Sequence, residues 1–360
     1  MCFIVISKNM LNRLILIVLL SSASQLYSQP GDRTLIEEGV KLHDQGKYTE
    51  AIAKFNEVLL SDKQNVHALA EKAYSQMGLK EYKAAISTCR KALKIKTDDN
   101  EALKLIYITY GNALDLSGKP KDAIKIYEKG LKEHPGFYSI LYNKGVTLSR
   151  MKDWDGAIEC FQQSAQASPN HSSTFLALGR MLVFKEQNIP ALLSYLRFHI
   201  IEPDSPRAKE NFKFIQELMF SNVEKTGDNS ISISLPSKSL EEMGNENKTE
   251  NSFRSIELIL SMQSALDLGE NQGELSDVER FEKKLNSMFV SLDESKKGNS
   301  GFYWEFLAPY FIELSTNNYE NVLAHLVFSN QEDEAVAAWF LENESKVRSF
   351  YEWSTGYQWY

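Results

Sequence analysis

The stretch "GKYTEAIAKFNEVLLSD" at residues 46–62 determines how the rest of the chain is interpreted. Apolar residues recur in it at helical spacing, with polar residues between them: Ala51, Ile52, Phe55, Val58 and Leu59. These residues form one apolar face of a helix, and a lone helix of this length is only marginally stable in water. The face must therefore be buried against neighbouring helices, which the sequence has to supply.

The same pattern returns further along the chain. It recurs in "KEYKAAISTCRKALKI" (80–95), "GKPKDAIKIYEKGLKE" (118–133) and "KDWDGAIECFQQSAQA" (152–167). Each copy has an Ala-Ile pair, followed three or four residues later by an aromatic residue or Cys. The pairs begin at Ala51, Ala85, Ala123 and Ala157, and a weaker copy begins at Ala191, so the spacing is 34 residues except for one step of 38.

A 34-residue period of paired helices is typical of tetratricopeptide repeats, and the chain resembles that family at several marker positions. A small residue lies in the middle of each first helix, at Gly39, Ala73, Gly111, Gly145 and Gly179. Turn residues such as Gly46 and Gly118 follow, and Pro135, Pro169 and Pro203 close the last three copies. The resemblance implies an all-α solenoid in which the small residues let paired helices approach closely.

The marker positions divide residues 32–205 into five helix pairs. We place the copies at 32–65, 66–99, 104–137, 138–171 and 172–205. Residues 206–224 would form a capping helix over the apolar face of the last copy, as the end of a solenoid requires.

The remainder of the chain has a different composition. Residues 225–252 are rich in Ser, Asn, Glu and Lys, which predicts a flexible linker, although "SISISL" (230–235) has the alternation of a short strand. Residues 253–360 show helical periodicity, many acidic residues and four of the five Trp, which predicts an acidic, aromatic-rich helical domain. This block resembles C-terminal blocks that follow such repeats in proteins of Bacteroidetes, to which no function is attached.

The N-terminus has the features of an export signal. Lys8 and Arg13 precede the apolar run "LILIVLL" and small residues follow it, so residues 1–28 are expected to be a signal peptide, with Met10 as an alternative start. The other interpretation is a buried or anchoring N-terminal helix. Export would place the protein in the periplasm or outside the cell, with no integral membrane segment after leader removal. Cys89 and Cys160 lie two repeats apart, too far for a disulfide, and are expected to be buried thiols.

The sequence offers little support for catalysis. Histidines are scattered over different copies, and no metal-ligand spacing, phosphate-binding loop or nucleophile motif is present, so we expect no metal, no cofactor and no enzyme. The net charge of −8 without a basic block argues against nucleic acid as a partner. A catalytic site would have to lie in the aromatic-rich residues 253–360, where Glu305, His325 and Glu342 could meet.

The predicted site is the concave groove of the solenoid. In the family, residues at positions two, five, six, nine, twelve and thirteen of each copy face that groove. In this chain the positions include His67, Tyr74, Met77, Asn112, Tyr142, Asn143, Arg150 and Arg180. Asn can bond a peptide backbone, Arg can bind a carboxylate with two hydrogen bonds, and Tyr offers rigid contact area. The family's carboxylate-binding set of Lys and Asn is incomplete here.

Two functions follow from these patterns. The first is an exported protein-protein interaction scaffold that binds a peptide or protein segment in the groove. The alternative is an envelope glycan-binding or glycan-processing protein that uses exposed aromatic rings of the C-terminal domain. Exposure of Trp304, Trp339, Trp353 and Trp359 distinguishes the two, because a sugar needs an open ring face.

Overall fold

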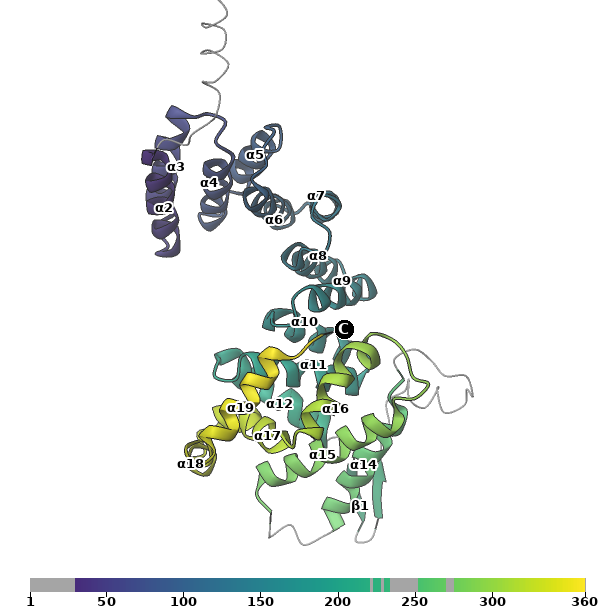
Figure 1. Cartoon of the computed structure of the whole chain (residues 1–360). Coiled ribbons are helices and arrows are strands. Elements are labelled where there is room, and N and C mark those ends of the chain that lie inside the picture. The colour runs from purple at the N-terminus through teal and green to yellow at the C-terminus, as the bar shows by residue number, and fades with distance from the viewer. Residues whose placement is uncertain (1–29, 221–222, 228–229, 234–251, 270–274, 360) are drawn as a thin grey trace, which may run out of the picture. The chain divides into compact units, whose positions relative to one another are not determined.

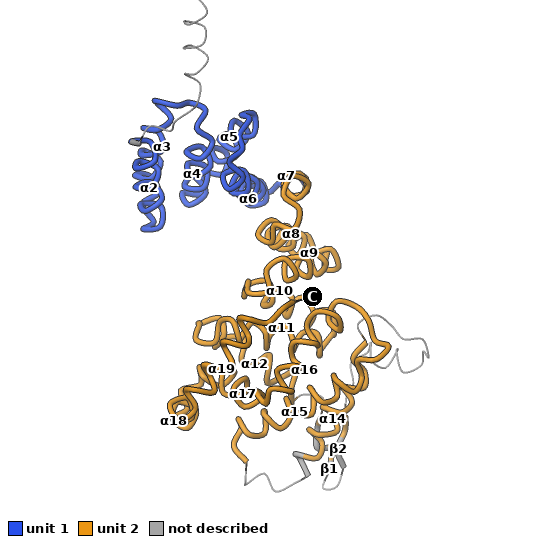
Figure 2. Tube along the Cα trace, viewed as in Figure 1, with its two compact units in different colours: residues 1–122 blue, residues 123–360 orange. Residues whose placement is uncertain are grey.

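The computed structural model describes residues 30–220, 223–227, 230–233, 252–269 and 275–359, which are mostly helical (Figure 1). The expected signal peptide therefore lies outside the described residues. The chain divides into two compact units, residues 1–122 and residues 123–360 (Figure 2). The division falls within helix α7 (Pro120–Glu133), and each unit is described by itself.

The first unit consists of helices that pack in sequential pairs. Its helices are α2 (Pro30–Asp44), α3 (Tyr48–Ser61), α4 (Val66–Gly78), α5 (Tyr82–Ala92) and α6 (Asn100–Leu116). Helix α2 packs on α3, α4 packs on α5, and α6 lies against both α4 and α5. Asn65 and Asp99 start α4 and α6 by accepting hydrogen bonds from the backbone N–H groups of Ala68 and Ala102.

The turn inside each helix pair contains one residue with a left-handed backbone. This residue returns at the spacing of the sequence repeat, with φ between 54° and 81°: Gly46, Lys80, Gly118, Lys152 and Glu186. At the first turn the N–H groups of Gly46 and Lys47 donate to the carbonyls of His43 and Leu42. Glycine adopts this conformation without steric cost, whereas Lys and Glu are held in it by the same hydrogen bonds in the other copies.

In three copies a glycine of the first helix makes room for an aromatic ring of the second helix. A Cβ atom added at Gly39 would lie 2.5 Å from the Phe55 ring, and one added at Gly145 would lie 2.6 Å from the Phe161 ring. Gly179 and Tyr195 repeat the arrangement at 2.7 Å. The markers therefore act as pairs within one copy, and the aromatic residue packs on its own glycine.

The second unit continues with paired helices and then changes architecture. Its repeat helices are α8 (Tyr138–Arg150), α9 (Trp154–Ala167), α10 (Ser172–Phe184) and α11 (Asn188–Ile201), followed by α12 (Pro206–Phe220). The C-terminal helices are α14 (Arg254–Gly269), α15 (Asp277–Ser295), a π-helical turn η1 (Tyr303–Leu307), α16 (Ala308–Thr316), α17 (Glu320–Phe328), a 3₁₀ turn η2 (Ser329–Gln331), α18 (Glu334–Glu342) and α19 (Glu344–Gly356). Helix α12 lies within the segment expected to form the capping helix.

A short β-hairpin begins in the last residues of the expected capping segment (206–224) and continues into the segment that we expected to be a linker (225–252). Strand β1 (Val223–Gly227) pairs antiparallel with β2 (Ser230–Ile233), with Val223 opposite Ile233. The first four residues of "SISISL" thus form a strand, and both strands contact α14. Residues 234–251 lie outside the described residues.

Helix α11 is buried on all sides. Every residue from Ile189 to Ile200 is buried, because α10 and α12 flank the helix and α14, α17 and η1 cover it. One hydrophobic core extends from Leu148 to Phe350 and joins the last repeats to the C-terminal helices. The C-terminal block is therefore continuous with the last repeats, which differs from the separate domain at residues 253–360 that the composition predicts.

A buried arginine lies at the centre of this junction. The Arg197 guanidinium donates hydrogen bonds to the carbonyl of Pro169 (3.1 Å), to Oδ1 of Asn170 (2.7 Å) and to Oγ of Ser354 (3.3 Å). Its Cζ also lies 4.7 Å from the ring centre of Tyr310 and 4.8 Å from that of Trp359. Two aromatic rings and three polar groups thus surround one cation, which ties the end of the chain to α11.

Cys89 and Cys160 are free and buried, as expected. Burial raises the pKa of the Cys89 thiol to about 12 and that of the Cys160 thiol to about 11, so both remain unreactive thiols at neutral pH. Among the described helices, none combines the length and the apolar character needed to cross a lipid bilayer.

Candidate functional site

The first unit contains a cavity of about 960 Å³ on the face of its first helices. One wall is α2, where Arg33, Ile36, Glu37, Val40 and Asp44 occupy the groove positions of the first copy. The other walls are the α3–α4 loop, the start of α4 and residues 95–99. The cavity therefore includes groove positions of the first copy and one predicted residue, His67, and it mixes apolar and charged side chains.

His67 lies in this cavity between two carboxylates. Its Nδ1 is 3.4 Å from Oδ2 of Asp99, and its Nε2 is 3.8 Å from Oε1 of Glu71. Burial raises the pKa of the Glu71 carboxyl, while the charge of His67 opposes this shift. The imidazole remains about half exposed, so it can contact a ligand.

Tyr74 lies further along α4 and stacks on a histidine of the preceding copy. The ring centres of Tyr74 and His43 are 4.4 Å apart, and His43 Nδ1 is 2.9 Å from Oγ of Ser75. Burial lowers the pKa of His43, which favours the neutral ring. Met77 on α4 and Asn112 on α6 are half-buried. The predicted residues of this unit thus include two that contact other side chains of the groove, His67 and Tyr74.

In the second unit, Tyr142 and Asn143 are partly used by the fold itself. Tyr142 packs its ring against Phe161 and against the edge of His171, with centres 5.8 and 5.0 Å apart. The Asn143 side chain donates to the carbonyl of Ser139 on its own helix at 2.7 Å. Asn143 is therefore less suited than predicted to bond an incoming peptide.

Arg150 and Arg180 are exposed on α8 and α10. Two apolar residues that the sequence prediction missed accompany Arg180, namely Val183 and Phe184, and 72% of Phe184 is exposed. The Phe184 ring stacks on Trp154 with ring centres 5.6 Å apart. Val183 and Phe184 occupy positions twelve and thirteen of the fifth copy, so the position rule could have found them.

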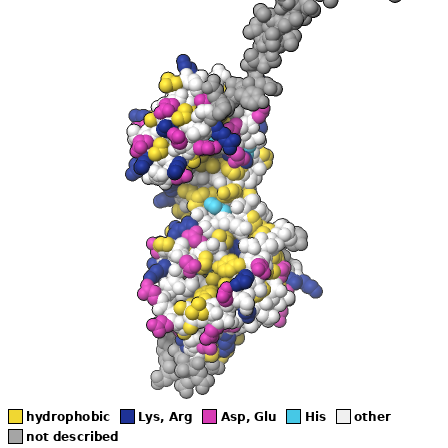
Figure 3. Space-filling view, turned by 60° about the vertical axis from the view of Figure 1, so that its left-hand side comes forward, with side chains coloured by type: hydrophobic (Ala, Val, Ile, Leu, Met, Phe, Trp, Pro, Cys, Tyr) yellow, Lys and Arg dark blue, Asp and Glu magenta, His cyan; other side chains and the backbone are white. Residues whose placement is uncertain are grey.

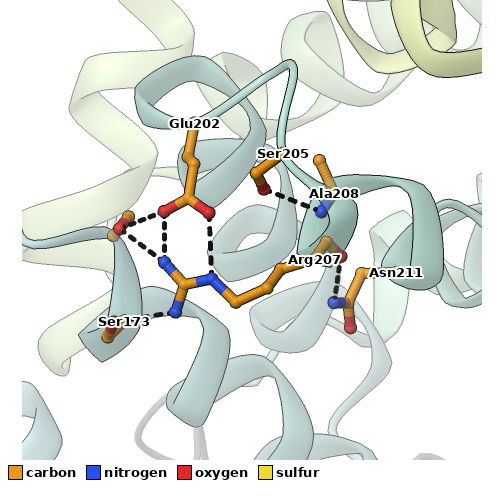
Figure 4. Close-up of polar contacts among 7 residues, drawn as sticks. Ser173, Glu202, Ser205, Arg207, Ala208 and Asn211 are labelled. Carbon is orange, nitrogen blue, oxygen red and sulfur yellow. Dashed lines mark hydrogen bonds and ion pairs between the residues drawn. The ribbon is translucent and has the colours of Figure 1, made fainter. Parts of the chain in front are cut away.

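A polar network holds α10, α11 and α12 together beside these helices (Figure 4). Arg207 donates from Nε to Oε1 of Glu202 (2.9 Å) and from Nη1 to Oγ of Ser173 (2.9 Å), and its Nη2 contacts Oε2 of Glu202. Burial alone would raise the pKa of Glu202, but the hydrogen bonds from Arg207, Ser205 and Ser172 and the charge of Arg207 lower it to about 2. The network fixes the end of the repeat array. It also includes Ser173, which occupies a groove position and already accepts a hydrogen bond from Arg207.

The aromatic tail presents little open ring surface. Trp304 is buried and stacks on Phe253 at 4.3 Å, and its Nε1 donates to the carbonyl of Ser252. Trp339, Trp353 and Trp359 are half-buried and contact other rings. Other rings of the protein therefore stack on at least one face of each of these four Trp side chains.

The structure does not bring Glu305, His325 and Glu342 together. Glu305 accepts a hydrogen bond from the Gly301 N–H, and His325 stacks on Trp339 with ring centres 3.8 Å apart. Glu342 is exposed, and no hydrogen bond or ion pair joins two of the three within the part of the chain that the structure describes. In that same part, no group of three His, Cys, Asp or Glu side chains is arranged to hold a metal ion.

The predicted site residues therefore fall into two sets. His67, Tyr74, Met77 and Asn112 belong to the first unit, whereas Tyr142, Asn143, Arg150 and Arg180 belong to the second. Figure 3 shows one face of the molecule, on which acidic and basic side chains are interspersed with apolar patches.

Comparison with known proteins identifies the repeats. Tetratricopeptide-repeat family models match residues 42–106 and residues 138–171. A probable UDP-N-acetylglucosamine–peptide N-acetylglucosaminyltransferase SPINDLY of Hordeum vulgare is 28% identical over 158 residues, which are 41% of this chain and 17% of that protein. This chain thus spans about a sixth of the length of that relative. The matched family models do not reach the last hundred residues, whose resemblance to Bacteroidetes proteins stays a prediction.

Solved structures of similar repeat arrays also match part of the chain. The MamA protein is 20% identical, with 47% of this chain and 90% of that chain covered and a TM-score of 0.38. YrrB, described as a tetratricopeptide-repeat protein with an unusual peptide-binding site, is 20% identical, with 50% and 90% covered and a TM-score of 0.38. TTC0263, a thermophilic repeat protein of Thermus thermophilus, is 16% identical, with 52% and 98% covered and a TM-score of 0.43. From the family models and the observed helix pairs together, residues 42–106 and 138–171 are tetratricopeptide repeats.

Proposed function

We propose that this chain is an exported protein-interaction scaffold that binds a peptide or protein segment on the concave faces of its repeats. The cavity of about 960 Å³ on α2 and the start of α4 carries the proposal, because its walls include five groove positions of the first copy and His67 of the second. Apolar residues such as Ile36 and Val40 offer contact area there, and charged residues beside them would fix the orientation of a bound segment. Binding would occur without any covalent step.

The exposed residues of α8 and α10 support a second contact region of the same function. Arg150 and Arg180 can each bind a carboxylate with two hydrogen bonds, and Phe184 adds an exposed ring. Large apolar side chains on a soluble protein's surface often mark interaction sites when polar residues surround them. An acidic, partly apolar segment fits these residues best.

Export rests on the sequence of residues 1–28 alone. A basic start followed by "LILIVLL" and small residues is typical of a cleaved leader. Export would bring the groove to partners in the periplasm or outside the cell. N-terminal sequencing of the mature protein tests this part of the proposal, since an uncleaved chain would contradict it.

The binding test is quantitative affinity capture from envelope extract of the source cells. Full-length protein is compared with the double variant Arg150→Glu and Arg180→Glu, and captured proteins are quantified by mass spectrometry. We expect the variant to lose about tenfold or more of each specific partner, because charge reversal replaces two attractions by repulsions. Circular dichroism checks that its helix content is unchanged.

A matched control reverses two exposed lysines of α7, Lys121→Glu and Lys132→Glu. This control has the same change in net charge as the double variant, but its substitutions lie outside the groove positions. It should capture the same partners in the same amounts as the native chain. Equal capture by all three proteins would contradict the assignment of the groove to α8 and α10. The corresponding variants for the first unit are Ile36→Glu and Val40→Glu, which place charge inside the cavity.

A further inference from the structure

Helix α18 in the C-terminal region has an apolar face that the described residues do not cover. Its sequence "EAVAAWFLE" is apolar nearly all round, yet Val336 is its one buried residue. Ala337 and Ala338 are exposed, and 84% of Leu341 is accessible to solvent. A helix that is apolar on every side is normally buried, so this exposed face marks an interaction surface.

A cavity of about 500 Å³ opens beside this helix. Pro203 and residues of α17, α18 and α19 form its apolar lining; the helical residues are Leu326, Val336, Ala337, Phe340, Val347 and Tyr351. Ala337 both lines the cavity and belongs to the exposed face of α18. The cavity and the helix face therefore form one continuous apolar surface, called the α18 surface below.

Carboxylates surround the mouth of the cavity. Asp204, Glu332, Asp333 and Glu334 line it, and no Lys, Arg or His is among the described residues that do so. Asp333 also starts α18 by accepting a hydrogen bond from the Ala335 N–H at 2.8 Å. Burial, and to a smaller extent the charge of Asp204, raise the pKa of the cavity residue Tyr351 to about 12.

The wall that carries these acids is fixed in place. Ser329 donates to Asp204 at 3.3 Å, and the Asn330 side chain donates to the carbonyl of Pro203. Glu332 also pairs with Lys209 of α12 at 2.9 Å. The loop after α17 is therefore bonded to the loop after α11, so the cavity is a built feature of the fold.

We propose that the α18 surface docks an amphipathic protein segment that carries lysine or arginine. The aliphatic stem of such a side chain would pack on Val336 and Phe340, and its charged end would reach the carboxylates at the mouth. Apolar residues of the same segment would cover Leu341, which lies outside the cavity. A small molecule bound in the cavity would not contact Leu341, so a protein segment fits this surface better. This surface is separate from the groove of the repeats, so the two proposals can fail independently.

Synthetic peptides on the full chain test the proposal. The probe is a labelled 16-residue helical peptide with Leu at helical spacing on one face and Lys beside it, and binding is measured by fluorescence anisotropy. We expect it to bind about tenfold or more tightly than the same peptide with Glu in place of every Lys. The affinity should fall as salt is raised, because the attraction is between partly exposed charges.

Two variants locate the binding. The first is a triple variant that removes three charges and keeps Asp333 as the cap of α18: Asp204→Asn, Glu332→Gln and Glu334→Gln. Its affinity for the Lys peptide should be about tenfold lower than that of the native chain. The second variant, Ala337→Trp, fills the cavity and should lower the affinity for the Lys peptide by a similar factor. The matched control, Glu133→Gln, Glu159→Gln and Glu186→Gln, removes three exposed charges elsewhere and should bind as the native chain does.

Three results would overturn the proposal. One is equal affinity for the Lys and Glu peptides, and another is equal loss of affinity in the control variant. The third is self-association: if sedimentation shows a dimer that Leu341→Ser abolishes, the α18 surface joins two copies of this chain instead. Circular dichroism of each variant shows whether the fold is retained, and the cavity-filling and charge variants report on separate contacts.

Discussion

Gly145 shows how a single atom controls the fit of a helix pair. A Cβ atom there would lie 2.6 Å from the Phe161 ring, so one of the two helices must shift. We expect Gly145→Ala to lower the free energy of unfolding by about 1–3 kcal/mol, although alanine favours the helical backbone. Urea denaturation followed by circular dichroism measures the change.

Two further variants separate this clash from a general effect of alanine. Gly356→Ala at the end of α19 adds a Cβ with nothing within 4 Å, so it should leave stability unchanged or slightly raised. In a Phe161→Leu background the cost of Gly145→Ala should shrink, because the smaller side chain leaves space for the methyl group. An unchanged cost in that background would show that the ring is not the obstacle.

His199 on α11 is buried, and neither of its ring nitrogens has a hydrogen-bond partner among the described residues. Burial lowers its pKa from 6.5 to about 4, against the charge of Glu202. Between pH 6.5 and 4, His199 is therefore protonated in the unfolded chain but neutral in the folded chain. The free energy of unfolding consequently falls as the pH drops from 6.5 to 4. We expect His199→Leu to flatten this slope and to change stability at pH 7 by about 1 kcal/mol or less.

The measurement is the free energy of unfolding in urea at several pH values between 7 and 4. The difference between the native chain and the variant isolates His199, since burial also lowers the pKa of His171 and His325. Glu202 affects stability at lower pH, because folding lowers its pKa from 4.5 to about 2. Its contribution to the free energy of unfolding is lost as the pH falls between those two values. Parallel pH profiles for the two proteins would refute the assignment.

At the scale of helices, the aromatic residues after α19 attach the end of the chain to α11. Trp359 stacks on Tyr310 at 5.0 Å and lies over the Arg197 guanidinium. We expect Trp359→Ala to lower the free energy of unfolding by about 2–4 kcal/mol, while the exposed neighbour changed in Gln358→Ala should shift it by less than about 0.5 kcal/mol. Chemical denaturation checks both values, and equal stability of the two variants would contradict the role of Trp359.

The helix pairs could be predicted from the sequence because their markers are local. An Ala-Ile pair, a small residue and an aromatic residue recur together, and each has a fixed partner within the same copy, as Gly39 and Phe55 show. The left-handed turn residue was harder to recognise. Glycine signals it at Gly46 and Gly118, but Lys80, Lys152 and Glu186 adopt it because the surrounding hydrogen bonds impose it.

Burial of α11 depends on residues far away in the sequence, which periodicity cannot detect. Its segment "NIPALLSYLRFHII" nevertheless carries a signal, since polar residues are scarce on the face that other second helices expose. A second helix that is apolar all round predicts a covering layer. Likewise, Val183 and Phe184 follow from the position rule, whereas the stacking of Tyr74 on His43 needs coordinates.

At the scale of the whole molecule, the sequence predicts one groove over five copies, and the structure divides the chain within α7. The described contacts support a cavity in the first unit and an exposed Arg and Phe cluster in the second. Local repeat patterns predict which residues face the groove. They do not identify the residues that the fold already uses, such as Asn143 and Ser173.

The complete burial of α11 has an evolutionary consequence. Repeat arrays usually grow or shrink when duplication or deletion of a gene segment adds or removes a copy at either end. Here a copy inserted after residue 205 would have to replace α12, α14 and α17 on α11 and would break the bonds of Arg197. Changes in copy number should therefore be found among related chains before the last copy, while that copy and the C-terminal helices are inherited as one unit.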